Sequence, residues 1–312
     1  MFLANKCLIY SKRHLFLTAY YMAKFFIKFR IVVVFILSSH CSYVCALSSI
    51  TTIGPQRVTD VSHTYFISLL ELILTATETS ASPTQINLVP YPGQGRTIAL
   101  MANSDLFDVI WTAESPERNA KIRKIPIPLL KGGLGIRGLV IRSSDASNFS
   151  NYNTKQLRSK IACQGMHWPD ADILQNSGFK VHRVLHFDAM LEMLSLKRCD
   201  YLPLSIFEGK AELDIVKSVF PELTFYQGTI IRYPLAMYFY VRKDNPELAD
   251  RLLLGLQLLE SKGELMRLMQ THPLTKTAFP LEQYEDSQII NLSSSHNAYS
   301  SAEQAYLLPF KH

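Results

Sequence analysis

Short apolar strands and amphipathic helices alternate on both sides of a glycine-rich stretch of this chain, and this alternation limits the folds that the chain can adopt. Before the glycines, apolar runs predict strands at residues 49–53, 85–91 and 107–111. A helix is predicted between the first two strands, where Phe66, Leu69, Leu70 and Ile73 recur at helical spacing. After the glycines, strands are predicted at 160–164, 180–185 and 200–204, with helices at 171–177 and 189–196. Each connection is long enough for a parallel crossover, which indicates α/β sheets.

The glycines at positions 132, 133, 135 and 138 loosen the chain around a predicted strand at 139–142 and indicate a hinge. A later strand at 235–242 is followed by Asn245-Pro246-Glu247, which supplies an N-cap and a first-turn proline for a helix. The residues beyond about 286 are polar and are expected to be loosely held. The pattern therefore predicts two α/β lobes joined by a hinge.

The basic side chains of the N-terminus indicate export. Residues 1–46 contain six Lys and Arg and no acid; removing these six from the 32 basic residues leaves 26, equal to the 26 acidic ones. A chain balanced in this way lacks the net basic field of a nucleic-acid binder, so no nucleic-acid partner is expected. The apolar run IVVVFIL and the small-residue site Val44-Cys45-Ala46 are typical of a signal peptide, cleaved near Ala46. We expect translation to start at Met22.

Seven uninterrupted apolar residues are too few to span a bilayer, which needs about 20. Three of the five cysteines lie in this leader, and Cys163 and Cys199 remain in the exported chain. Two cysteines do not make a zinc site, so no metal is expected. They could pair in an oxidising compartment, but two buried thiols are the favoured interpretation.

Four segments then carry a resemblance to a known family. They are DLFDVIWTAESPERNAKIRKIPIPLLKGGLGIRGLVIR (105–142), TKQLRSKIACQGMHW (154–168), KRCDYLPLS (197–205) and the stretch 232–269. In order and spacing they are similar to the motifs of family 3 extracellular solute-binding proteins, over about residues 49–272. The resemblance implies an α/β, two-lobed periplasmic-binding-protein-like II fold with a hinge and an interlobe ligand cleft. It places 47–137 and 235–285 in a discontinuous first lobe, 138–234 in the second, and 286–312 in a tail.

In the first lobe, the resemblance aligns Arg118 with the arginine that clamps a ligand carboxylate. A guanidinium suits this role because its donors meet a carboxylate bidentately, although a solvated surface arginine is the alternative. Trp111, at the end of its strand, would stack on the ligand or pack in the core. Thr112 and Ala113 would offer a hydroxyl and backbone groups. Arg96, at a helix start, would face an anion or lie on the surface.

In the second lobe, the turn Gly165-Met166-His167-Trp168 replaces the family's anion-binding turn, so the glycine is kept, the hydroxyls are lost, and the last three residues add bulk and aromatic surface. Ser205 stands where amino-acid binders carry an aspartate that pairs with the ligand's ammonium group. An amino acid would then bury an uncompensated charge, unless Glu208 substitutes for that aspartate.

The resemblance implies a periplasmic, monomeric protein that captures a small polar or anionic molecule, amino-acid-like or a carboxylate, for an ABC-type uptake system. Its partners would be the ligand and a membrane permease or receptor, with no cofactor and no catalytic residue. An orphan sensor of the same fold is the alternative, because sensing and transport use the same cleft. A dehydratase-like enzyme is a further one, with His167 and Glu208 as the candidate acid and base.

Overall fold

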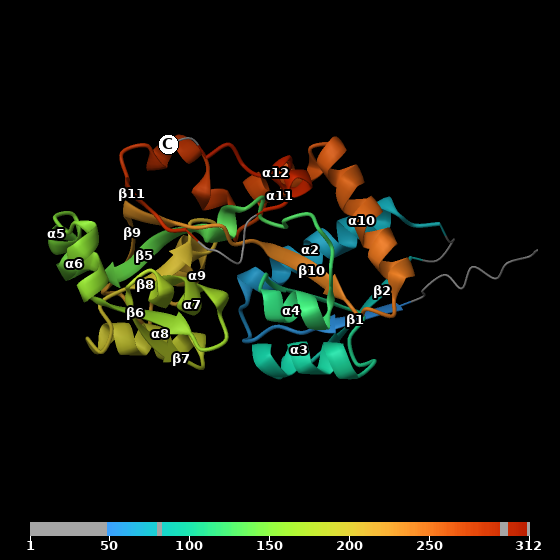
Figure 1. The fold of residues 1–312 in the computed structure, drawn as a ribbon, viewed down its shortest axis with the longest axis horizontal. Helices are drawn as coiled ribbons and strands as arrows, with labels where there is room; N and C mark the ends of the chain where they lie inside the picture. The colour runs from blue at the N-terminus through green and yellow to red at the C-terminus, as the bar shows by residue number, and fades with distance from the viewer. Residues whose placement is uncertain (1–48, 80–82, 294–298, 311–312) are drawn as a thin grey trace, which may run out of the picture. The chain divides into compact units, whose positions relative to one another are not determined.

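The computed structural model describes residues 49–79, 83–293 and 299–310. Leu47–His312 forms one compact unit, and the leader predicted for residues 1–46 lies outside the described residues. Within the described ranges, no helix combines the length and the apolar character needed to cross a membrane. The compact unit has two lobes, and Figure 1 shows the strands of the first lobe on the right and those of the second on the left.

The first lobe is built on two small sheets. β1 (Ser49–Ile53) pairs in parallel with β2 (Gln85–Val89). β10 (Met237–Val241) pairs antiparallel with β3 (Val109–Ala113) and β4 (Arg123–Lys124). The backbone N–H of Asp108 donates to the Thr51 oxygen at 2.8 Å and joins the two sheets. The helices are α2 (Val61–Ala76), α3 (Gln94–Asn103), α4 (Pro116–Lys121), α10 (Pro246–Ser261) and α11 (Glu264–Thr271).

Helix α2 shows how the apolar periodicity produces this lobe. It begins at Asp60, whose carboxylate accepts a hydrogen bond from the His63 N–H and so satisfies a free donor of the first turn. Its predicted apolar residues are all fully buried. Gly255 lets α10 pack closely against α2, because a Cβ atom at position 255 would lie only 2.6 Å from the Ile73 side chain.

The second lobe has a four-stranded sheet in the order β11-β9-β5-β8. Its strands are β5 (Ile136–Arg142), β8 (Leu202–Ser205), β9 (Leu223–Arg232) and β11 (Gln288–Asn291). β5 pairs antiparallel with both β8 and β9, and β11 pairs in parallel with β9, so this sheet is mixed. β6 (Ile161–Gly165) and β7 (Lys180–Val184) form a parallel pair, and an Ala162–Tyr201 bridge joins β6 to the segment that leads into β8.

Short helices cover the second lobe and the connections. They are α5 (Ala146–Phe149), α6 (Thr154–Ser159), α7 (Pro169–Asn176), α8 (Phe187–Ser195) and α9 (Gly209–Ile215). Single 3-10 turns are η1 (Gly133–Gly135), η2 (Ser143–Asp145), η3 (Lys276–Ala278) and η4 (Leu281–Tyr284). The chain is thus the two-lobed α/β protein that the sequence predicts.

Two of the chain's crossings between the lobes lie side by side at the hinge. One runs through η1 into β5, and the other leaves β9 at Arg232 and enters β10 at Met237. The Tyr233 N–H donates to the Gly135 oxygen at 3.0 Å, so the crossings are hydrogen-bonded to each other. Gly135 is required there, because any side chain would collide with the backbone oxygen of Tyr233.

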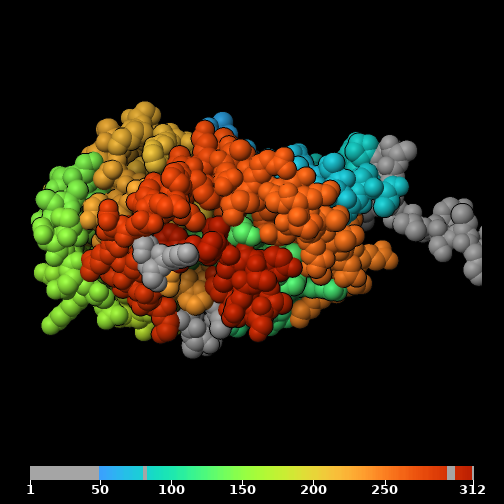
Figure 2. All heavy atoms as spheres, turned by 90° about the horizontal axis from the view of Figure 1, so that it is seen from above, coloured from blue at the N-terminus to red at the C-terminus, as the bar shows by residue number. Residues whose placement is uncertain are grey.

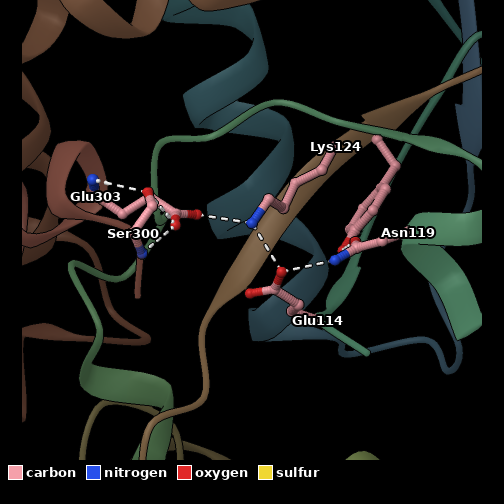
Figure 3. A network of polar contacts seen from close by, with 6 residues as sticks. Glu114, Asn119, Lys124, Ser300 and Glu303 are labelled. Carbon is pink, nitrogen blue, oxygen red and sulfur yellow. Dashed lines mark hydrogen bonds and ion pairs between the residues drawn. The ribbon is translucent and has the colours of Figure 1, made fainter. Parts of the chain in front are cut away.

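The C-terminal residues differ from the loosely held tail expected. β11 extends the second-lobe sheet beside β9, and the short helix α12 (Ser301–Gln304) carries a buried Glu303. Glu303 accepts hydrogen bonds from Lys124 at 2.7 Å and from the Ser300 hydroxyl at 2.6 Å (Figure 3). Figure 2 shows the C-terminal residues, in red, spread over one face of the molecule beside the orange helices. The segment therefore connects a second-lobe strand to first-lobe side chains.

The two remaining cysteines are paired, which corrects the expectation of two free thiols. Cys163 on β6 and Cys199 form a disulfide with 5.7 Å between their Cα atoms. The Cys163 N–H donates to the Tyr201 oxygen at 2.9 Å, and this contact holds the two segments side by side.

Candidate functional site

A cavity of about 150 Å³ lies where the two lobes meet. Trp111, Thr112 and Ala113, at the end of β3, contribute to its first-lobe wall. Arg137, Asp170 and Glu208 contribute to its second-lobe wall. Leu134 in η1 and Met237 at the start of β10 line it beside the hinge. The cavity therefore depends on both lobes and on the crossings between them.

The first-lobe wall is aromatic and polar. The Trp111 ring stacks on Phe66, with 5.3 Å between ring centroids, and both side chains line the cavity. The Thr112 hydroxyl accepts a hydrogen bond from the Gln94 amide at 3.3 Å. The amide oxygen of Gln94 is buried without a partner among the described residues, so the wall offers a ligand one free acceptor.

Arg118 lies behind this wall and outside the cavity lining. Ser115 caps α4, which carries Arg118, and the arginine is 6% exposed. Nη1 donates to the Thr112 hydroxyl at 2.7 Å and to the Ala113 oxygen at 2.6 Å. Nη2 donates to the backbone oxygen of His167, in the second lobe, at 2.6 Å. Burial lowers the pKa of the guanidinium, and carbonyl and hydroxyl oxygens of the chain accept its hydrogen bonds.

The second-lobe wall contains a buried charge cluster of which only Glu208 was proposed from the sequence. Arg137 on β5 contacts the carboxylate of Asp170, in the first turn of α7, and both side chains are 3% exposed. The Tyr233 hydroxyl donates to the same carboxylate at 2.6 Å. Burial alone would lower the pKa of Arg137, but Asp170, Tyr233 and Glu208 raise it, so the guanidinium stays charged. Arg137 and Asp170 thus form a balanced pair.

Glu208 follows β8 and is the second acid of the cluster. Its Oε2 lies 3.9 Å from Nη1 of Arg137, and no described donor makes a hydrogen bond to its carboxylate. Burial and the nearby Asp170 outweigh Arg137 and raise the pKa of Glu208 to about 7. Glu208 therefore faces the cavity as a carboxylate with too little positive charge around it.

The structure brings together four of the ten residues proposed from the sequence, Trp111, Thr112, Ala113 and Glu208, at the cavity. Ser205 is fully buried; its hydroxyl donates to the Gly133 oxygen at 3.0 Å and accepts from the Phe207 N–H at 3.1 Å. Arg96 is exposed on α3. Neither residue lines the cavity.

The turn after β6 contains residues that lie at the cavity and residues that lie outside it. Gly165 is buried under the indole of Trp168, which itself lines the cavity. Met166 and His167 are exposed and lie outside the lining, and the His167 ring packs against Gly95 at the start of α3. Trp168 belongs to the turn singled out from the sequence, and its position between a strand end and a helix start was the available signal for the missed residue Asp170.

No described group of three or more His, Cys, Asp or Glu side chains is arranged to hold a metal ion.

No protein-family model matches the chain, and no curated protein matches it either. Solved structures do match. An ancestral arginine-binding protein bound to arginine has a TM-score of 0.53 and 15% identity, covering 72% of this chain and 98% of that one. A histidine kinase sensor domain with similarity to periplasmic binding proteins has a TM-score of 0.54 and 14% identity, covering 72% and 95%. These matches confirm the predicted two-lobed periplasmic-binding-protein fold.

A third structure is a His/Glu/Gln/Arg/opine family-binding protein from Silicibacter pomeroyi in complex with lysine. It has a TM-score of 0.54 and 13% identity, covering 72% of this chain and 96% of that one. The bound molecule is arginine in the first of these structures and lysine in the third.

Proposed function

We propose that the protein is an extracytoplasmic solute-binding protein that captures a small polar molecule in the interlobe cavity by hinge closure and delivers it to an ABC-type uptake system. The observation that carries this proposal is the composition of the cavity wall. Trp111 and Thr112 come from one lobe, and Glu208 and Asp170 from the other. Separating the lobes at the hinge opens such a cavity, and closing them encloses the ligand.

Export is supported by two features of the chain. The leader predicted from residues 1–46 directs the protein across the membrane. The disulfide between Cys163 and Cys199 fits an oxidising compartment such as the periplasm. The mature protein would act there as a monomer, with a membrane permease as its partner.

A sensory role is the second candidate, because the fold is shared with a histidine kinase sensor domain. The cavity would bind its ligand in the same way, and closure would signal to a receptor. A pull-down of membrane proteins with ligand-loaded protein separates the two roles, since an uptake protein captures a permease and a sensor captures a signalling receptor.

An enzymatic role has less support. One similar structure is an ancestral amino-acid-binding protein described as a precursor of cyclohexadienyl dehydratase. Of the two acid–base candidates, Glu208 lines the cavity, and His167 is exposed outside it. The pair therefore lacks the shared site that proton transfer requires.

A thermal-shift screen of amino acids, carboxylates, amines and sugars on the full chain tests the proposal. A ligand that binds only the folded protein raises its melting temperature by mass action. We expect at least one class to do so in a saturable way. A melting temperature that no class changes would contradict a receptor role.

A further inference from the structure

The charged side chains that line the cavity do not balance one another. Among the described residues, three charged side chains line it: Arg137, Asp170 and Glu208. Arg137 and Asp170 are in contact and neutralise each other, and Tyr233 completes the hydrogen bonding of Asp170. Glu208 remains, with its nearest cationic nitrogen at 3.9 Å. The ionised wall therefore has an excess of one negative charge.

Arg118 does not correct this excess at the cavity surface. Its guanidinium lies behind Thr112 and Ala113, and its Nη atoms donate to those residues and to His167. The charge of Arg118 acts on Asp170 and Tyr91 of the lining, but its Nη atoms are already engaged by the chain, so a ligand carboxylate in the closed cavity would contact Glu208 and Asp170 and not this guanidinium. Removing a carboxylate from water into such surroundings is unfavourable.

The uncharged part of the wall suits a positive charge. Phe66, Tyr91, Trp111 and Trp168 line the cavity, and the faces of aromatic rings attract cations. The partnerless amide oxygen of Gln94 is an acceptor for an N–H donor. The partnerless Nε of Arg137 is a donor for a hydroxyl or carbonyl oxygen of the ligand.

We propose that the ligand is a small organic cation without a carboxylate, such as an amine, a guanidine or a quaternary ammonium compound, with its positive charge placed against Glu208 and between the aromatic rings. This inference rests on the proposed function and narrows its ligand class. It replaces the anionic or amino-acid-like ligand that the sequence led us to expect.

The test is a comparison of matched probes on the full chain by thermal shift and calorimetry. The pairs are agmatine with arginine, choline with betaine, and putrescine with ornithine; within each pair the first member lacks the carboxylate. Succinate serves as the anion. We expect a cation to bind at least about tenfold more tightly than its carboxylate-bearing counterpart.

The outcomes separate this inference from the proposed function. Tighter binding of a zwitterion or of succinate than of every cation would overturn the inference and leave the receptor role intact. Stabilisation by none of the probes, and by no compound in the wider screen, would contradict both.

Replacing Glu208 supplies the residue-level test. Glu208→Gln keeps the shape and removes the charge, so cation affinity should fall by about 10- to 100-fold while the melting temperature is retained. Asp214→Asn is the matched control, because Asp214 is an exposed acid on α9 that pairs with Lys210 away from the cavity. Equal affinity of wild type and Glu208→Gln for the bound cation would overturn the assignment.

The pH dependence gives a second readout. Glu208 faces Arg137 and Asp170, and its pKa is raised to about 7. Because a cation prefers the ionised carboxylate, wild-type affinity should rise roughly tenfold from pH 6 to pH 8, and binding near pH 7 should release protons. Glu208→Gln should show no such change. Proton uptake on binding would instead indicate an anionic ligand.

Discussion

Nη2 of Arg118 donates a hydrogen bond to the backbone oxygen of His167, 2.6 Å away, and so links the two lobes of the protein across the cleft. The same guanidinium holds the end of β3 through Thr112 and Ala113. Arg57 makes a second connection of this kind, to Glu212 and Asp188 on the second lobe. The closed arrangement of the lobes is therefore stabilised by side chains of the chain itself.

Arg118→Ala should destabilise the closed arrangement. Loss of three hydrogen bonds from a buried charged donor should lower the free energy of unfolding by about 2–3 kcal/mol. Arg118→Lys should retain only part of this stabilisation, because lysine lacks the planar fork of N–H donors. Small-angle scattering should give a larger radius of gyration for the alanine variant without ligand. An unchanged radius and an unchanged melting temperature would show that Arg118 does not hold the lobes.

The Arg137–Asp170 pair should respond differently to single and double substitution. Arg137→Met or Asp170→Leu alone leaves a buried charge without its partner and should cost about 3–5 kcal/mol of unfolding free energy. The double variant removes both charges and should be clearly more stable than either single variant. Urea titration of the three variants measures the coupling. Additive losses would mean that the pair is not formed.

Glu303 should make stability depend on acid pH. Burial raises the pKa of Glu303, but hydrogen bonds from Lys124 and Ser300 outweigh burial and lower it to about 2. A carboxyl with a lowered folded-state pKa stabilises the protein above its unfolded-state pKa, and this contribution disappears as the pH falls from about 4.5 to 2. Because the Lys124 side chain keeps partial contact with solvent, we expect this contribution to be about 1 kcal/mol.

Glu303→Gln should remove this contribution to stability at pH 7 and should weaken the packing of the C-terminal segment against the first lobe. Urea midpoints of wild type and variant should differ at pH 7 and converge near pH 2. Hydrogen exchange in residues 299–310 should accelerate in the variant. A constant difference across this pH range would rule out the role assigned to Glu303.

The disulfide should contribute substantially to stability. Cys163 and Cys199 are 36 residues apart, and closing a loop of this size stabilises a protein by about 3–4 kcal/mol through the unfolded state. The double variant Cys163→Ala/Cys199→Ala should melt at a lower temperature than the oxidised wild type. Thiol titration of the denatured, unreduced protein should detect no free thiol at either position. Two free thiols would show that the pair is not formed.

The sequence predicted elements that leave a local apolar pattern and missed strands that do not. The apolar spacing of Phe66, Leu69 and Ile73 identified α2, because a buried helix face leaves a local pattern. β9 was missed, since Gln227 and Gly228 interrupt its apolar alternation. β11 was missed because four residues pairing with one neighbour carry little local signal.

The sequence predicted those residues of the site whose place follows from their position at the end of a strand. Trp111 and Thr112 end an apolar strand, and this places them at the cleft in an α/β fold. The partner of Arg118 could not be predicted, because His167 is 49 residues away and is brought near only by tertiary packing. Arg137 lies in an apolar strand, and no sequence pattern indicates that Asp170 balances its charge.

Calorimetric titration of the strongest ligand from the screen into wild type and Met237→Trp tests whether the ligand binds in the cavity between the lobes. Met237 lines the cavity at the start of β10 and is only partly buried, so a larger ring there fills the cavity without entering the core. We expect the wild type to bind one ligand per chain and the variant to bind it at least about 100-fold more weakly, with its melting temperature retained. Equal affinity for the two proteins would place the ligand elsewhere and contradict the account.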